Sequence, residues 1–231
     1  MGHARTLKAR GTGLAARGAW TRTWIFDLDN TLHDADPHIF PHINQSMTDY
    51  LRTELGLEPD AATALRQQYW RRYGATLLGL MRHHGTNPQH FLWHTHQFPE
   101  LKRMLVREPL LRATVRRLPG RKILFSNGPM HYLRAVLKAL GIADLFDAVF
   151  SIESTRFRPK PDVSGFVRFV RTNRLHPRRC IMVEDTLANL RTAKKLGIKT
   201  VWLSRDRRTP RYVDLKIESL SELRRHLTQL A

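Results

Sequence analysis

Asp27-Leu28-Asp29-Asn30-Thr31 follows a short apolar run, Thr23-Trp24-Ile25-Phe26, and this stretch decides the fold. The apolar run is typical of a buried strand, and two carboxylates come directly after it. In a strand, residues i and i+2 point the same way, so Asp27 and Asp29 are predicted to face one pocket. Such a pair can hold a divalent cation while one acid attacks a phosphorus atom and the other moves a proton. The stretch predicts phosphatase chemistry, although a single D-x-D is also typical of a solvated turn.

A second apolar run, Ile123-Leu124-Phe125, ends in Ser126-Asn127-Gly128. This pattern predicts a strand followed by a loop that cradles a phosphate through Ser126 and Asn127. Glycine at 128 lets backbone N–H groups approach an anion without a Cβ in the way. The alternative is an ordinary turn between a strand and a helix.

A third segment, Arg158-Pro159-Lys160-Pro161-Asp162, places one lysine between two prolines. Proline restricts its own backbone and that of the residue before it, so the Lys160 ammonium is predicted to point in few directions. A fixed cation suits a phosphoryl group. The alternative is a proline-rich surface loop with a solvated lysine.

A fourth segment, Ile181-Met182-Val183-Glu184-Asp185-Thr186, predicts a buried strand that ends in two acids before a helix. Acids at this position suit a hard cation with oxygen ligands. They also suit the N-terminus of a helix, where an acid or threonine accepts bonds from free N–H groups.

Strands and helices alternate along the chain outside residues 32–121. This alternation predicts an α/β fold with a Rossmann-like, doubly wound parallel sheet, which binds ligands at the carboxyl ends of its strands. The expected strands are Thr23–Asp27, Lys122–Ser126, Ala148–Ile152, Arg179–Val183 and Lys199–Leu203, and the expected helices include Met130–Leu140, Val163–Asn173 and Leu187–Leu196.

The insertion between the first two motifs, residues 32–121, is predicted to be all-helical. Proline, which is favoured in the first turn of a helix, begins three expected helices, Pro37–Leu55, Pro59–His83 and Pro88–Phe98. We expect residues 32–109 to form a helical cap and residues 23–31 and 110–231 to form the catalytic core. A cap of this kind closes over a small substrate and excludes water.

Taken together, the four segments resemble the motifs of the haloacid dehalogenase (HAD)-like hydrolase superfamily, in its helical-cap branch. The resemblance implies that Asp27 is a nucleophile forming an aspartyl-phosphate and that Asp29 is the acid and base. It implies phosphoryl contacts from Ser126 and Lys160. Dehalogenases that attack carbon have no carboxylate at the position of Asp29, so the chain looks like a phosphatase.

The same resemblance implies a Mg²⁺ cofactor. Its ligands would be the Asp27 carboxylate, the Asp29 backbone carbonyl and the Asp185 carboxylate. Supporting roles would fall to Thr31, Glu184 and Asn189.

Within the cap, Tyr73-Gly74-Ala75-Thr76-Leu77-Leu78-Gly79-Leu80, together with His83, Asn87-Pro88 and Phe91, resembles the pyrimidine 5′-nucleotidase group. That likeness implies release of phosphate from nucleoside monophosphates such as UMP and CMP. The glycines at 74 and 79 cost about 1 kcal/mol each in a helix, so they indicate close packing or room for a ligand. Phosphoglycolate phosphatases and sugar phosphomutases share the core motifs and remain alternatives.

The chain carries 39 Lys and Arg against 20 Asp and Glu, a net charge of +19 over 231 residues. This charge attracts phosphorylated substrates and nucleic acid, so a basic nucleic-acid-binding protein on a phosphatase scaffold is a second alternative. Residues 1–22 are predicted to be a flexible basic tail. With one cysteine and no long apolar stretch, the sequence indicates a cytoplasmic protein without membrane association. Nothing in it sets the oligomeric state.

Overall fold

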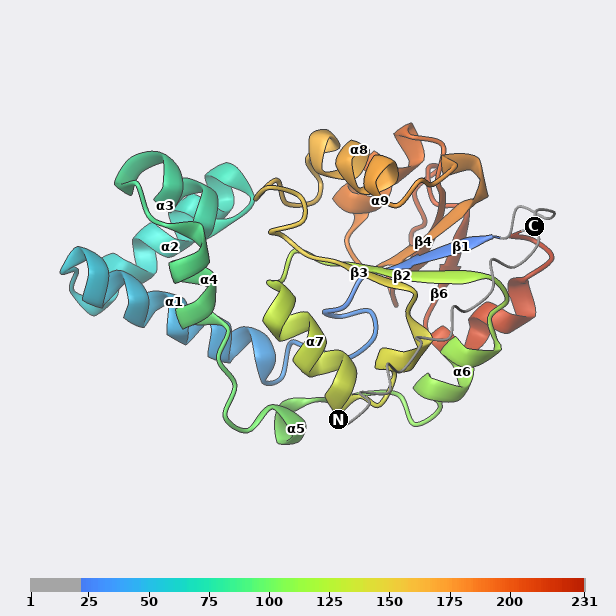
Figure 1. Ribbon diagram of the computed structural model, residues 1–231, viewed down its shortest axis with the longest axis horizontal. Helices are drawn as coiled ribbons and strands as arrows, with labels where there is room; N and C mark the ends of the chain where they lie inside the picture. Colours follow the sequence, from blue (N-terminus) through green and yellow to red (C-terminus); the bar gives the residue numbers. More distant parts are fainter. Residues whose placement is uncertain (1–21, 231) are drawn as a thin grey trace, which may run out of the picture.

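The computed structural model describes residues 22–230, so the predicted basic tail lies outside the described residues except for Arg22. The chain forms a parallel sheet with helices on both faces and a group of helices at one end (Figure 1). The predicted fold class, a doubly wound α/β sheet with an inserted helical cap, is confirmed.

The sheet has strand order β3-β2-β1-β4-β5-β6, and every pairing is parallel. The chain builds outward from β1 to one side and then to the other, which is the topology of a doubly wound sheet. The strands are β1 (Thr23–Phe26), β2 (Arg121–Phe125), β3 (Ala148–Phe150), β4 (Cys180–Glu184), β5 (Lys199–Leu203) and β6 (Leu215–Ile217). The edge strand β6 is absent from the predicted strands, because Leu215-Lys216-Ile217 is short and has no continuous apolar run, unlike Ala148-Val149-Phe150 of β3.

Nine α-helices and three short 3₁₀ helices occur in the described residues 22–230. They are α1 (Ile39–Leu55), α2 (Pro59–Tyr73), α3 (Thr76–His84), α4 (Pro88–Thr95), α5 (Leu101–Met104), α6 (Leu111–Arg117), α7 (Met130–Ala139), η1 (Ala143–Leu145), α8 (Val163–Thr172), η2 (Pro177–Arg179), α9 (Leu187–Lys195) and η3 (Leu220–His226). None of the helices in this part of the chain is both long and apolar enough to cross a membrane.

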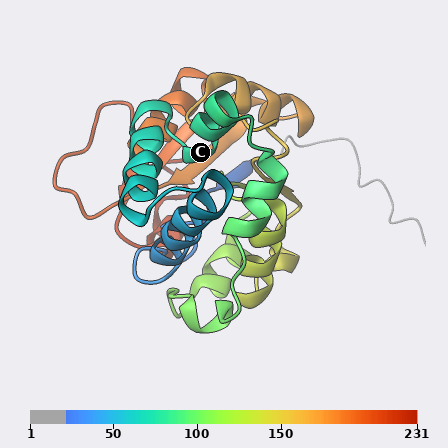
Figure 2. The same ribbon diagram turned by 90° about the vertical axis from the view of Figure 1, so that its left-hand side faces the viewer.

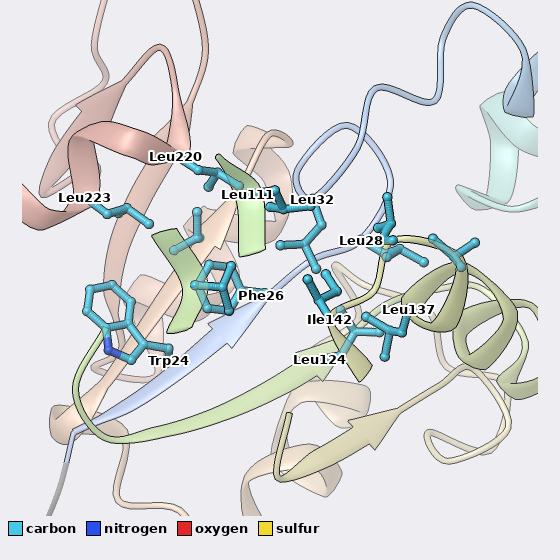
Figure 3. Packing of buried hydrophobic residues seen from close by; sticks show 14 of the residues in the cluster. Trp24, Phe26, Leu28, Leu32, Leu111, Leu124, Leu137, Ile142, Leu220 and Leu223 are labelled. Atoms are coloured by element: carbon cyan, nitrogen blue, oxygen red, sulfur yellow. The ribbon is translucent and has the colours of Figure 1, made fainter. Parts of the chain in front are cut away.

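The central strand β1 is buried on both faces, as expected for a parallel sheet covered by helices. Trp24 and Phe26 face a cluster that includes α6, α7 and η3, whereas Ile25 faces the cluster under α8 and α9. Figure 3 shows Leu111 and Leu220 packed around the first of these clusters. The alternation along β1 places its end, and the acids after it, at one fixed edge of the sheet.

The cap consists of α1 to α4, which lie together beyond the carboxyl edge of the sheet (Figures 1 and 2). One predicted helix, Pro59–His83, is wrong as a single element, because the chain turns at Gly74 with φ +77 between α2 and α3. Glycine adopts this left-handed conformation at little cost. Helix α1 begins at Ile39 instead of Pro37.

The two chain crossings between core and cap run side by side, because the Asp34 N–H donates to the Val106 carbonyl at 2.7 Å. Leu101 and Met104 of α5 pack against the cluster around β1. The cap has its own apolar cluster, which includes Tyr69. The predicted division at residues 109 and 110 stays a prediction.

Close packing explains the glycine at 79. A Cβ built at this position would lie 2.2 Å from Cγ of Tyr69. In an unobstructed helix, Gly79→Ala would stabilise the protein by about 1 kcal/mol. Overpacking costs about 1–3 kcal/mol, so we expect a net loss of stability in urea unfolding.

The double variant provides the control for this prediction. Tyr69→Gly removes the whole side chain, including the Tyr69 Cβ that would lie 2.6 Å from a Cβ at position 79. In that background, adding Gly79→Ala should raise the free energy of unfolding. The same sign in both backgrounds would contradict the packing account.

Candidate active site

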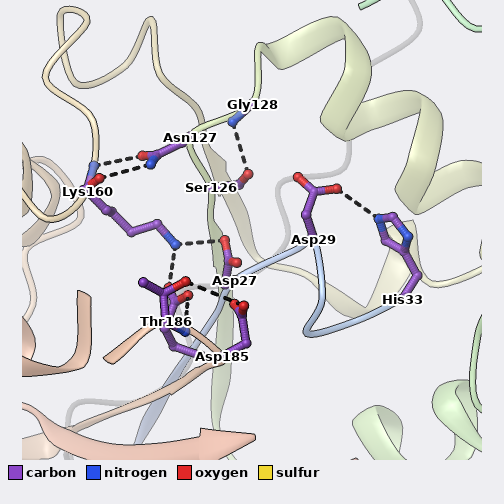
Figure 4. A network of polar contacts seen from close by, with 10 residues as sticks. Asp27, Asp29, His33, Ser126, Asn127, Gly128, Lys160, Asp185 and Thr186 are labelled. Atoms are coloured by element: carbon purple, nitrogen blue, oxygen red, sulfur yellow. Dashed lines mark hydrogen bonds and ion pairs between the residues drawn. The ribbon is translucent and has the colours of Figure 1, made fainter. Parts of the chain in front are cut away.

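Four segments that are distant in the sequence meet at the carboxyl edge of the sheet (Figure 4). Asp27 follows β1, Ser126 follows β2, and Asp185 follows β4, whereas Lys160 comes from the loop between β3 and α8. The parallel pairing of β1 with β2 and β4 brings the strand ends together. Loop 151–162 then reaches back across this edge.

Lys160 lies between two carboxylates at the centre of the site. Its Nζ is 2.7 Å from Oδ1 of Asp27 and 2.6 Å from Oε2 of Glu184. All three residues are buried. Burial disfavours the ammonium charge, but the two carboxylates outweigh burial and raise the pKa of Lys160. The lysine is therefore a fixed cation, in place of the solvated lysine of the alternative interpretation.

Asp27, Glu184 and Asp185 form a cluster in which one ligand atom of each lies within 4.8 Å of the others. Burial and, next, the Glu184 charge raise the pKa of Asp27 to about 7. Burial also raises the pKa of Glu184 to about 7 and the pKa of Asp185 above its ordinary value. Three ionised carboxylates against one ammonium leave two negative charges, a balance that a divalent cation would neutralise. Their oxygen atoms are the ligands that Mg²⁺ prefers.

The loop after β2 contains the buried hydroxyl of Ser126 and the side-chain amide of Asn127, which have different hydrogen-bond partners. The Ser126 side chain is 2 % exposed, and its Oγ accepts a bond from the Gly128 N–H at 3.1 Å. The Asn127 amide donates to the Lys160 carbonyl at 3.0 Å and accepts from the Lys160 N–H at 2.7 Å. The side chain of Asn127 thus holds the lysine loop, and its predicted phosphate contact would have to come from its backbone.

Asp29 is oriented differently from the strand-based expectation. Strand β1 ends at Phe26, so the alternation of side chains does not extend to Asp29. Its Oδ1 accepts from the Tyr132 hydroxyl at 2.6 Å and lies 3.0 Å from Nε2 of His33. The Asp29 carboxylate is outside the cluster of three acids. The sequence does not predict either hydrogen-bond partner of Asp29. His33 lies close to the first motif in the sequence and could have been considered, whereas no local pattern distinguishes Tyr132.

The three predicted supporting residues, Thr31, Glu184 and Asn189, are all buried. Glu184 bonds the Thr186 N–H through Oε1 at 3.1 Å, besides its contact with Lys160. Asn189 is buried on α9. The Thr31 hydroxyl is buried and has no hydrogen-bond partner within residues 22–230. It therefore does not fix the first loop through a bond to the protein.

Comparison with known proteins supplies the family context. Residues 21–197 match the family model described as haloacid dehalogenase-like hydrolase. Phosphate metabolism protein 8 of Saccharomyces cerevisiae is 26% identical over 196 residues, which are 77% of this chain and 60% of that protein. The chain thus spans less than two thirds of that relative's length.

Two further proteins resemble the chain over most of its length. The phosphoglycolate phosphatase of Pseudomonas putida is 24% identical over 216 residues, covering 88% of this chain and 76% of that enzyme. The crystal structure of a HAD phosphatase from Thermococcus onnurineus superposes with a TM-score of 0.65 at 24% identity, covering 90% of this chain and 98% of that one. The structural likeness supports the fold.

The excess negative charge predicts how stability depends on pH. The pKa of Asp27 is about 7 in the folded protein, against an ordinary value of 3.8. Ionised Asp27 therefore lowers the stability of the folded protein above pH 7. This loss of stability becomes smaller as the pH falls from 7 toward 4, because the folded protein then binds a proton that the unfolded chain does not. In EDTA at pH 8, Asp27→Asn should therefore be more stable than the unchanged protein.

Thermal unfolding at pH 8 and pH 5 checks this prediction. The advantage of Asp27→Asn should shrink at pH 5, and Mg²⁺ at pH 8 should stabilise the unchanged protein more than the variant. A variant that is less stable at both pH values, by equal amounts, would contradict the charge balance.

Proposed function

Because the chain belongs to the haloacid dehalogenase-like hydrolases, we propose that it is a Mg²⁺-dependent phosphomonoesterase that acts through an aspartyl-phosphate on Asp27. The observation that carries this proposal is the buried Lys160 ammonium between Asp27 and Glu184, 2.7 and 2.6 Å away, beside the carboxylate of Asp185. A pure binding protein needs no such arrangement. The relatives named as phosphatases support the same reaction class.

In the first half-reaction, an Asp27 carboxylate oxygen attacks phosphorus, and the bond from phosphorus to the leaving oxygen breaks. Asp29 gives its proton to that oxygen. Splitting the displacement into two covalent steps lowers the barrier of each. Lys160 fixes one Asp27 oxygen, Oδ1, through its 2.7 Å contact, which leaves the other oxygen for the attack.

In the second half-reaction, Asp29 takes a proton from water, whose oxygen then attacks the phosphorus atom. The bond between Asp27 and phosphorus breaks, and phosphate leaves. Ser126 and Lys160 are suited to hold phosphoryl oxygens as charge redistributes. A Mg²⁺ ion held by Asp27, the Asp29 carbonyl and Asp185 would supply charge neutralisation for this transfer.

We infer that the substrate is a pyrimidine nucleoside monophosphate such as UMP or CMP. The support is the sequence likeness of the cap in residues 73–91, which fall in α2, α3 and α4. Phosphoglycolate is the second candidate, because a relative from Pseudomonas putida bears that activity in its name. A sugar phosphomutase would use the same core residues with a different outcome.

The remaining proposals concern partners and location. The net charge of +19 supports attraction of phosphorylated ligands and keeps nucleic-acid binding as a rival role. The one cysteine, Cys180, is buried and free, which supports the proposed cytoplasmic location.

Phosphate release by the purified protein with Mg²⁺ tests the substrate. We expect UMP and CMP to be hydrolysed in preference to AMP, GMP, phosphoglycolate and hexose phosphates, and EDTA to stop the reaction. Preference for another ester would overturn the nucleotidase assignment. No release from any ester would overturn the enzyme proposal and favour nucleic-acid binding.

Two near-isosteric variants test the residue roles. Asp27→Asn removes the nucleophile, so we expect release at the level of the blank. Asp29→Asn removes the acid and base, which contributes about 10²–10⁴-fold, so we expect a loss in kcat of that size. Circular dichroism serves as the folding control, and wild-type turnover by either variant would rule out the mechanism.

A further inference from the structure

Two buried side chains meet on one oxygen of Asp29. An ionised carboxylate can only accept, so both donate to it in that form, with His33 as the tautomer that carries its hydrogen on Nε2. The Tyr132 hydroxyl is 2.6 Å from Oδ1, and Nε2 of His33 is 3.0 Å from the same atom. Tyr132 is 1 % exposed and His33 is 3 % exposed. The two residues come from different parts of the chain, α7 and the loop after β1.

Neither donor has another polar role in the part of the chain that the structure describes. Asp29 is the only hydrogen-bond partner found there for the Tyr132 hydroxyl, and Nδ1 of His33 has none. Buried polar groups are costly unless they are bonded, so placing both here is favourable only through Asp29. Packing alone does not explain them, since phenylalanine would fill the space of Tyr132.

The ring of Tyr132 is itself held by the segment that returns from the cap. Its centroid lies 5.7 Å from that of His96 and 5.1 Å from that of Phe98. Nε2 of His131, the residue before Tyr132, is 3.1 Å from the His96 carbonyl. The Tyr132 ring, which belongs to the core, is thus held in place by the segment that returns from the cap.

The consequence for Asp29 is a difference between its two oxygens. Oδ1 is occupied by two donors, so the proton of the acid form belongs on Oδ2. No hydrogen bond to Oδ2 is found within residues 22–230. Figure 4 shows this second oxygen pointing away from His33, toward the side of the site that holds Ser126 and Asp27.

We propose that Tyr132 and His33 are positioning residues that present the Asp29 proton to the leaving oxygen. This inference rests on the proposed phosphomonoesterase function and adds two residues to its mechanism. An alkoxide is strongly basic and must be protonated as the bond to phosphorus breaks. A nitrophenolate is weakly basic and leaves without that proton.

Tyr132→Phe tests the proposal with two esters, because it removes only the hydroxyl. The readout is kcat/KM, which reports the steps up to departure of the leaving group and excludes the aspartyl-phosphate hydrolysis that both esters share. For UMP, or the fastest alkyl ester of the substrate panel, we expect kcat/KM to fall about 10-fold, part of what a positioned acid contributes. For p-nitrophenyl phosphate we expect kcat/KM to change by less than about 2-fold, since protonation of the leaving group matters little there. The measured quantity is the ratio of the two losses, which a general structural defect would not move.

Tyr50→Phe is the matched control. It removes a tyrosine hydroxyl that lies 2.9 Å from Nδ1 of His90 inside the cap. Any loss of activity in this variant should therefore be the same for the alkyl ester and for p-nitrophenyl phosphate. At His33, the donor-retaining variant His33→Gln should keep more alkyl ester turnover than His33→Leu. Thermal unfolding of each variant separates folding defects from positioning.

The possible failures are distinguishable. Equal losses of Tyr132→Phe on both esters, or no loss on either, would overturn the positioning role and leave the phosphatase proposal intact. If the unchanged protein hydrolysed neither ester, the proposed function and this inference would fall together.

Discussion

The buried ammonium of Lys160 is the constraint on which the site depends. It lies 2.7 Å from Asp27 and 2.6 Å from Glu184, and both acids are buried. Buried carboxylates without a partner are strongly destabilising, so the lysine makes this group of acids possible. It does not balance them fully, because Asp185 adds a third negative charge. The protein thus carries an electrostatic cost that a divalent cation and a phosphoryl group would relieve in different ways.

The fold meets this constraint through strand order. Placing β1 between β2 and β4 puts Asp27 beside Ser126 and Asp185, and packing on both faces of β1 keeps it from shifting. Only Lys160 must come from a loop, and that loop is held by both polar atoms of Asn127. The cap shares none of these contacts, so it is free to determine the substrate without disturbing the charged centre.

Most of the site could be predicted from the sequence because each acid or hydroxyl directly follows an apolar strand. Ser126 was located in this way, and Lys160 was marked by its two prolines. The partners of Asp29 could not be predicted, since Tyr132 is aimed by packing against the cap and resembles any core aromatic on α7. The break at Gly74 was missed for a related reason. A left-handed turn between two helices leaves the apolar period almost continuous, and only the φ of +77 reveals it.

In the proposed reaction, Asp27 carries the phosphoryl group between the two half-reactions. Rapid acid quenching during turnover, followed by mass spectrometry of the peptide that contains Asp27, tests it most directly. With p-nitrophenyl phosphate, whose leaving group needs no proton from Asp29, we expect a phosphate bound to Asp27 whose level rises in Asp29→Asn, where hydrolysis of the aspartyl-phosphate is slowed. Sustained turnover with no phosphorylated peptide, or with phosphate on another residue, would contradict it.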